Sequence, residues 1–292
     1  MTLGNYAHFV LTKQYERLVE REAGVLQDQE PEHLHQMRVN SRRLRTALKV
    51  FEPVLDLPKS ASEKHIQTLA RVLGQLRDLD VQIAALSDQY RPQVPEAEQQ
   101  LIDRAIQHLA DQRITAFEQV QATLTGAKYQ NLKAAYGEWL ETPRYRALAD
   151  LPVAVALPDL LSPLLSELLL HPGWWVTNDQ RHTKAGLLLH ELRKTCKHAR
   201  YQAEFFTDFY GDDFEAWVDE LKQLQERLGV VQDTHVLLEI LTNYSSLAEL
   251  ADLQQAIAQQ QDKAMAQWDK LQAKYLEPRF RQSLYQMILS PK

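Results

Sequence analysis

A cationic row is the first feature of this sequence whose residue types and spacing could do chemistry. The stretch "HLHQMRVNSRRLR", residues 33–45, holds two histidines and four arginines with no acid among them, although the chain carries a net charge of −6. Each residue of a helix advances by about 100°, so side chains spaced 3, 4, 3 and 4 apart share an arc of roughly 80°. In this stretch and just beyond it, that spacing selects His35, Arg38, Arg42, Arg45 and Lys49.

The chemistry that such a row favours is the binding of an extended anion. Like charges at i,i+4 repel and lower helix stability by a few tenths of a kcal/mol per pair, so an uninterrupted row is more reasonable if an anion lies along it. The planar guanidinium donates two hydrogen bonds to two oxygens and stays charged at any working pH. Groups rooted about 5–6 Å apart match a chain of phosphates better than one small metabolite.

Two other interpretations of the row remain. The arginines could pair with acids of a neighbouring helix, for which "RDLD", Arg77 to Asp80, offers partners. A metal site is less favoured, because no second histidine stands at helical spacing from His35, and zinc normally takes three or four ligands. A histidine that donates to phosphate, more strongly when protonated, fits the row better.

The row recurs 155 residues later. "LHQMRVNSRRLRTALKVF" aligns without a gap with "LHELRKTCKHARYQAEFF", and "LGQLRDLDV" with "LGVVQDTHV"; twelve of the 53 positions from Leu34 to Leu86 are identical to the residue 155 places on. The second row comprises His190, Arg193, Lys197 and Arg200 and ends in Glu204 where the first has Lys49. Two apolar arcs beside the rows are expected to face the core: Leu34, Met37, Leu44, Leu48 and Phe51, and Leu189, Leu192, Cys196, Ala199 and Phe206.

The elements that must position these rows are helices. Apolar residues recur with a 3.6-residue period through most of the chain, and no alternating run of β-branched residues indicates a strand. Helices are predicted over residues 5–26, from Pro31 to before Pro53, and over about 59–90, 96–124 and 128–141. Gly74 and Gly229, in mid-helix, are expected to let two helices approach closely.

The repeat predicts an all-α fold of two related four-helix bundles, formed by internal duplication and related by a pseudo-twofold axis. The expected divisions are residues 1–150, a proline-rich linker at 151–165, and residues 166–292.

The composition limits the function. Of the 292 residues, 45% are hydrophobic and 25% charged, as in a soluble globular protein. No membrane span or signal peptide is apparent, and a single cysteine fits a reducing cytoplasm. The pI near 5.9 disfavours a general nucleic-acid coat, so any polyanion site must be local. No phosphate-binding glycine loop, dinucleotide fingerprint or nucleophile–histidine–acid set is present, so neither catalytic residues nor a cofactor are expected.

The paired HxxR-x3-[RK]-x2-R segments, each followed by its LG segment, resemble the duplicated signature of the CHAD domain, the conserved histidine α-helical domain. The resemblance covers nearly the whole chain. It implies two four-helix bundles and binding of inorganic polyphosphate, or another linear polyanion, on a basic surface between them. The contacts that it implies are His35, Arg38, Arg42 and Arg45, then His190, Arg193, Lys197 and Arg200, with Arg77 matching the family's RD pair.

The chain departs from the family pattern at two positions, since Arg77 becomes Gln232 and Lys49 becomes Glu204 in the second copy. The second half is therefore expected to bind more weakly. No ExExK motif of a triphosphatase-type domain precedes Asn5, so a stand-alone, non-enzymatic, cytoplasmic polyphosphate-binding protein is expected, with granule association left open. The alternatives are a metal-dependent phosphoanhydride hydrolase, an RNA-binding module, which would normally add exposed aromatics, and a protein scaffold.

Overall fold

The computed structural model describes residues 1–182, 186–242 and 249–292, which contain helices and no β-strand. The all-α prediction is confirmed. The chain forms two compact units, residues 1–153 and 154–292. The internal duplication stays a prediction.

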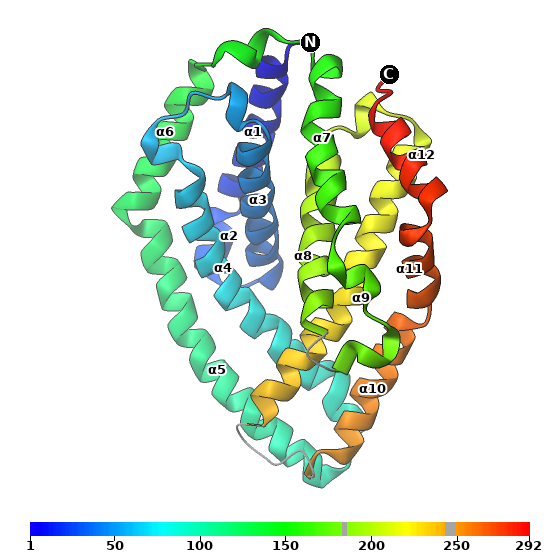
Figure 1. Cartoon of the computed structure of the whole chain (residues 1–292). Coiled ribbons are helices and arrows are strands. Elements are labelled where there is room, and N and C mark those ends of the chain that lie inside the picture. Colours follow the sequence, from blue (N-terminus) through cyan, green and yellow to red (C-terminus); the bar gives the residue numbers. More distant parts are fainter. Residues whose placement is uncertain (183–185, 243–248) are drawn as a thin grey trace. The chain divides into compact units, whose positions relative to one another are not determined.

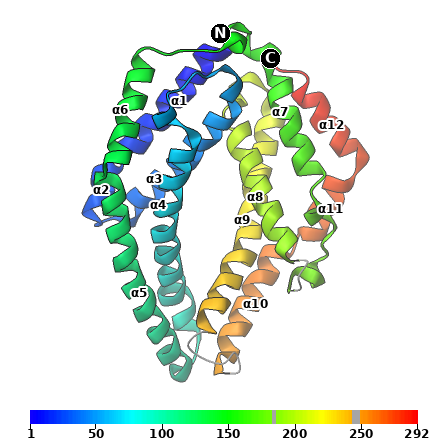
Figure 2. The same cartoon turned by 60° about the vertical axis from the view of Figure 1, so that its left-hand side comes forward.

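Unit 1 is built around α3, which lies between α1 and α4 (Figures 1 and 2). α4 packs against α5 on another side, and α6 follows α5. The helices are α1 (Leu3–Glu20), α2 (Glu22–Gln27), α3 (Pro31–Val50), α4 (Glu63–Ala84), α5 (Glu96–Thr125) and α6 (Ala127–Glu141).

Three of the predicted helices of unit 1 have close to their expected bounds, and two are interrupted. Proline at the first turn fixes the start of α3, and Pro53 disfavours helix in the residue before it, so α3 ends at Val50. The predicted helix at 5–26 is divided at Arg21 into α1 and α2. The predicted helix at 59–90 contains α4 but begins in a 3₁₀ turn (Lys59–Ala61) and ends in a π-helical turn (Ala85–Tyr90).

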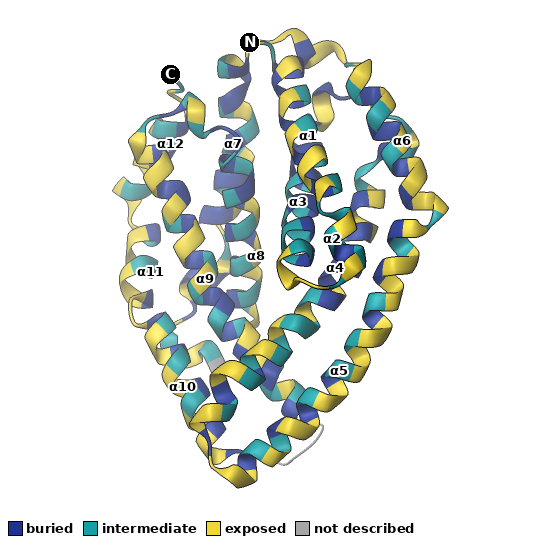
Figure 3. Ribbon diagram, turned by 180° about the vertical axis from the view of Figure 1, so that it is seen from behind, coloured by how far each residue is buried: buried dark blue, intermediate teal, exposed yellow. Residues whose placement is uncertain are grey.

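Unit 2 has α8 packed along α9, and α9 along α10 (Figure 2). Buried and exposed residues alternate in stripes along its long helices, as in unit 1 (Figure 3). The helices are α7 (Val153–Leu169), α8 (Gly186–Ala203), α9 (Asp212–Leu241), α10 (Ala251–Met265), α11 (Trp268–Leu276) and α12 (Pro278–Ile288).

Helix α7 corrects the expectation of a linker. Most of the expected linker at 151–165 is helical and includes Pro158 and Pro163. Two interior prolines cost about 6 kcal/mol, but burying five leucines at helical spacing contributes about 7–15 kcal/mol, so the helix survives. These leucines are Leu157, Leu161, Leu164, Leu165 and Leu168.

The sequence shows no obvious membrane span, but one segment passes the length and composition test for crossing a membrane. Residues 153–175 are long and apolar enough to do so by length and composition. However, 44% of that window is buried inside the protein, and the core helix of a soluble protein passes the same test.

Candidate anion-binding site

The two faces predicted for α3 and α8 are present in the structure. All ten residues of the expected core arcs are buried. Beside them, every member of the two rows is half-buried except Lys49, which is exposed. The rows therefore border the core of each unit with part of each side chain accessible to solvent.

Arg38 lies across the neighbouring helix rather than extending into solvent. Its Nη2 donates to Asp78 Oδ1 at 2.9 Å, and only 19% of its side chain is exposed against 59% for the aspartate. Its Nε is buried and has no hydrogen-bond partner among the described residues. The guanidinium covers Gly74, since a Cβ built on that glycine would lie 3.6 Å from Nε.

Arg193 has the corresponding arrangement in unit 2. Its Nη2 lies 3.8 Å from Asp233 Oδ1, and its Nε is likewise buried without a partner in the described part of the chain. A Cβ on Gly229 would lie 3.2 Å from Nε and 3.4 Å from Nη2. In both units, therefore, the expected close approach at the glycine is made by an arginine side chain.

The next arginine of each row has a different partner in the two units. Arg45 Nε donates to Glu63 at the start of α4, and Lys49 Nζ lies 3.9 Å from the same carboxylate. Arg200 instead pairs with Glu204, which directly follows the end of α8, at 2.8 Å, and its Nε donates to Gln225 of α9 at 3.1 Å. The change from Lys49 to Glu204 thus places directly after α8 the acid that α4 supplies in unit 1.

Arg77 differs from the paired arginines. It lies on α4 next to Asp78, is half-buried, and makes no hydrogen bond or ion pair with any residue that the structure describes. Its counterpart Gln232 carries no charge. Arg77 is therefore a donor that a ligand can engage without breaking an internal contact.

The two row histidines are half-buried. Nδ1 of His190 is buried and has no hydrogen-bond partner among the described residues. Burial lowers the pKa of His190, and the positive charge of Lys194 acts in the same direction. The free protein therefore favours the neutral imidazole, and a bound anion would favour protonation.

The acids beside the rows reduce the local positive charge, but they do not prevent a ligand from binding to the rows. Partly exposed ion pairs contribute about 0–1 kcal/mol each in water. A polyanion that offers several phosphate oxygens can therefore compete with the aspartates for the terminal amino groups. Sequence reasoning anticipated Asp78 as a partner but missed Glu63, which contacts the row only because α3 and α4 pack antiparallel.

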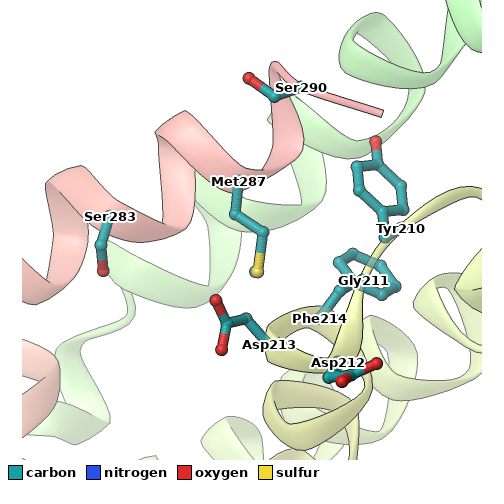
Figure 4. A pocket seen from close by; sticks show the side chains of 8 residues that line it. All are labelled: Tyr210, Gly211, Asp212, Asp213, Phe214, Ser283, Met287 and Ser290. Carbon is teal, nitrogen blue, oxygen red and sulfur yellow. The ribbon is translucent and has the colours of Figure 1, made fainter. Parts of the chain in front are cut away.

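Within the described part of the chain, neither a metal site nor the pocket of unit 2 competes with the rows as an anion site. No group of three or more His, Cys, Asp or Glu side chains suited to a metal ion occurs among the described residues. A pocket of about 490 Å³ lies between the start of α9 and α12, where Asp212 and Asp213 line it together with Ser283 and Met287 (Figure 4). It contains no predicted site residue, and its carboxylates disfavour an anion.

The chain belongs to the CHAD domain family, whose model matches residues 10–242. It is similar to the crystal structure of the CHAD domain from the plant Ricinus communis, with 25% identity and a TM-score of 0.64 over 100% of this chain and 94% of that one. It also has the fold of PptA from Streptomyces chartreusis, at 14% identity and a TM-score of 0.65 over 97% and 99% of the two chains. No match was found among the curated proteins. Family membership supports a polyphosphate-related function at the level of the family.

Proposed function

We propose that this CHAD protein binds inorganic polyphosphate through the cationic rows of α3 and α8, and that it does so without hydrolysing it. The observation that carries the proposal is the shared placement of Arg38 and Arg193. Each is held across a glycine of the next helix with part of its guanidinium accessible. Fixed guanidinium groups suit a repeated phosphate because little rotamer entropy is lost when they bind it.

Within each row the proposed contacts follow one helix face. In unit 1 they are His35, Arg38, Arg42, Arg45 and Lys49, with Arg77 added from α4. In unit 2 they are His190, Arg193, Lys197 and Arg200. The weaker binding proposed for unit 2 follows from Gln232 and Glu204, which remove one positive charge and reverse another.

Charge reversal tests the proposal. The double variant Arg38→Glu with Arg193→Glu should abolish polyphosphate binding in a calorimetric or filter titration and leave the helical circular-dichroism signal intact. The matched control is Arg91→Glu with Arg279→Glu, which changes the net charge equally in the same two units but outside the rows. Unchanged affinity in the first variant, or equal loss in both, would contradict the proposal.

Hydrolysis is the principal alternative. Of the carboxylates beside the rows, Asp78, Glu63, Asp233 and Glu204 are each paired with a row arginine, and Glu191 is paired with Lys194. We therefore expect no phosphate release when the protein is incubated with polyphosphate and Mg²⁺. Release that is lost in the Arg38→Glu, Arg193→Glu variant would assign an enzymatic function instead.

A further inference from the structure

We infer that Gly74 and Gly229 are positioning residues for the anion site: each keeps open the strip of helix on which the guanidinium of Arg38 or Arg193 lies. This inference rests on the proposed polyanion binding. It assigns a role to two residues that would not themselves touch the ligand.

The geometry of the guanidinium leads to this assignment. A guanidinium has five N–H donors in a fixed plane. In both arginines Nε is buried against the glycine-bearing helix, and one terminal nitrogen faces an aspartate. Because Nε is covered, the donors left for a phosphate are on the terminal amino groups. The arginine is therefore oriented to bind a phosphate through its two terminal amino groups rather than through Nε and one amino group.

The glycines make this orientation possible because neither carries a side chain extending beyond a Cβ, and at Gly229 even a Cβ would lie closer to the arginine than side chains normally pack. Helix position i+4 lies only about 40° around the axis from position i, so the aspartate stands one turn beyond the glycine on nearly the same face. A guanidinium lying over the glycine can therefore reach Asp78 or Asp233. A side chain longer than that of alanine at the glycine position would occupy that path.

The two units differ in how tightly the arginine lies on the glycine, which provides a matched control. At Gly74 an added Cβ would be 3.6 Å from Arg38 Nε, an ordinary van der Waals contact. At Gly229 it would be 3.2 Å from Arg193 Nε and 3.4 Å from Nη2, closer than side chains normally pack. Alanine should therefore be neutral at position 74 and displace the arginine slightly at position 229, whereas leucine should displace it fully.

The test is polyphosphate affinity in Gly74→Ala, Gly229→Ala and Gly229→Leu, with the thermal unfolding midpoint of each. Gly74→Ala should bind like the wild type. Gly229→Leu should lose affinity about tenfold, as when one hydrogen bond to a charged group is removed. The affinity of Gly229→Ala should lie between those of Gly74→Ala and Gly229→Leu. The alanine variants should unfold at the same or a higher temperature, because alanine favours helix over glycine.

A double-mutant cycle shows whether the glycine acts through the arginine. In an Arg193→Ala background, Gly229→Leu should have no further effect on affinity. An additive loss there, or wild-type affinity in folded Gly229→Leu, would overturn the inference while leaving polyphosphate binding established by the wild-type titration. Absence of binding by the wild type would overturn both the inference and the proposed function.

Discussion

Replacing Arg77 by glutamine gives unit 1 the residue that unit 2 has at the corresponding position, Gln232. Arg77 is half-buried and makes no hydrogen bond or ion pair with the residues that the structure describes. Its replacement should therefore leave the free energy of unfolding within about 0.5 kcal/mol of the wild type. Any change in polyphosphate affinity then reports the contact with the ligand.

The expected size of the effect follows from one exposed charge. A unit charge about 4 Å from a phosphate is worth about 1 kcal/mol in water, and a hydrogen bond to a charged group about 1.5 kcal/mol. Affinity should therefore fall about five- to tenfold. If a linear polyphosphate releases counterions as a single-stranded nucleic acid does, the slope of log affinity against log salt should also become shallower by about 0.7.

The assay is a calorimetric titration with polyphosphate at several salt concentrations. Arg91→Gln is the matched control: it removes one positive charge from the same unit, roughly 20 Å further along the chain at the helical rise, well beyond a Debye length of about 8 Å. Equal losses in the two variants would show that net charge, rather than the row, governs binding. An unchanged affinity in Arg77→Gln would exclude Arg77 from the site.

Two further predictions concern pH and stability. A bound polyanion should raise the pKa of His190, which burial lowers in the free protein, so affinity should increase as the pH falls from the bound-state pKa to the free-state pKa. His190→Gln should flatten this part of the pH profile measured by titration, and a profile identical to the wild type would exclude His190. The charged groups that face this histidine are Lys194, Glu191, Arg193 and Asp233. Arg113 donates to both carboxylate oxygens of Asp28 and to Asp80, each at 2.7 Å, and Asp80 is only 8% exposed. Arg113→Ala should therefore destabilise unit 1 by about 2–4 kcal/mol in urea unfolding, because it leaves a buried carboxylate unpaired, and a loss no larger than that of the exposed Arg91→Ala would contradict this.

The helices and rows could be predicted because their signal is local. A 3.6-residue period places Leu34, Met37 and Leu44 on one arc and Arg38 and Arg45 on the next, whatever the rest of the chain does. The buried arcs of α3 and α8 are confirmed for that reason.

The contacts across helices could not be predicted, because they depend on how two helices pack. Asp78 was a candidate because it follows Arg77 in a short acidic motif. Nothing in the sequence, however, places Glu63 opposite Arg45 or puts a guanidinium over Gly74. These contacts require the antiparallel pairing of α3 with α4. The spacing of residues along one helix carries no information about that pairing.

The error at α7 has a different origin. Its prolines indicated a linker, yet the five leucines at helical spacing were present in the same stretch. Local propensity and burial favour opposite outcomes there, and the buried leucine stripe outweighs the two missing hydrogen bonds.

Polyphosphate binding by the two rows is tested by a titration of the wild-type protein and the Arg38→Glu, Arg193→Glu variant with polyphosphate, at two salt concentrations and with RNA as competitor. We expect wild-type binding that weakens strongly with salt, resists competition by RNA, and is absent from the folded variant. Binding that persists in the variant, or that RNA displaces at equal phosphate concentration, would contradict this expectation.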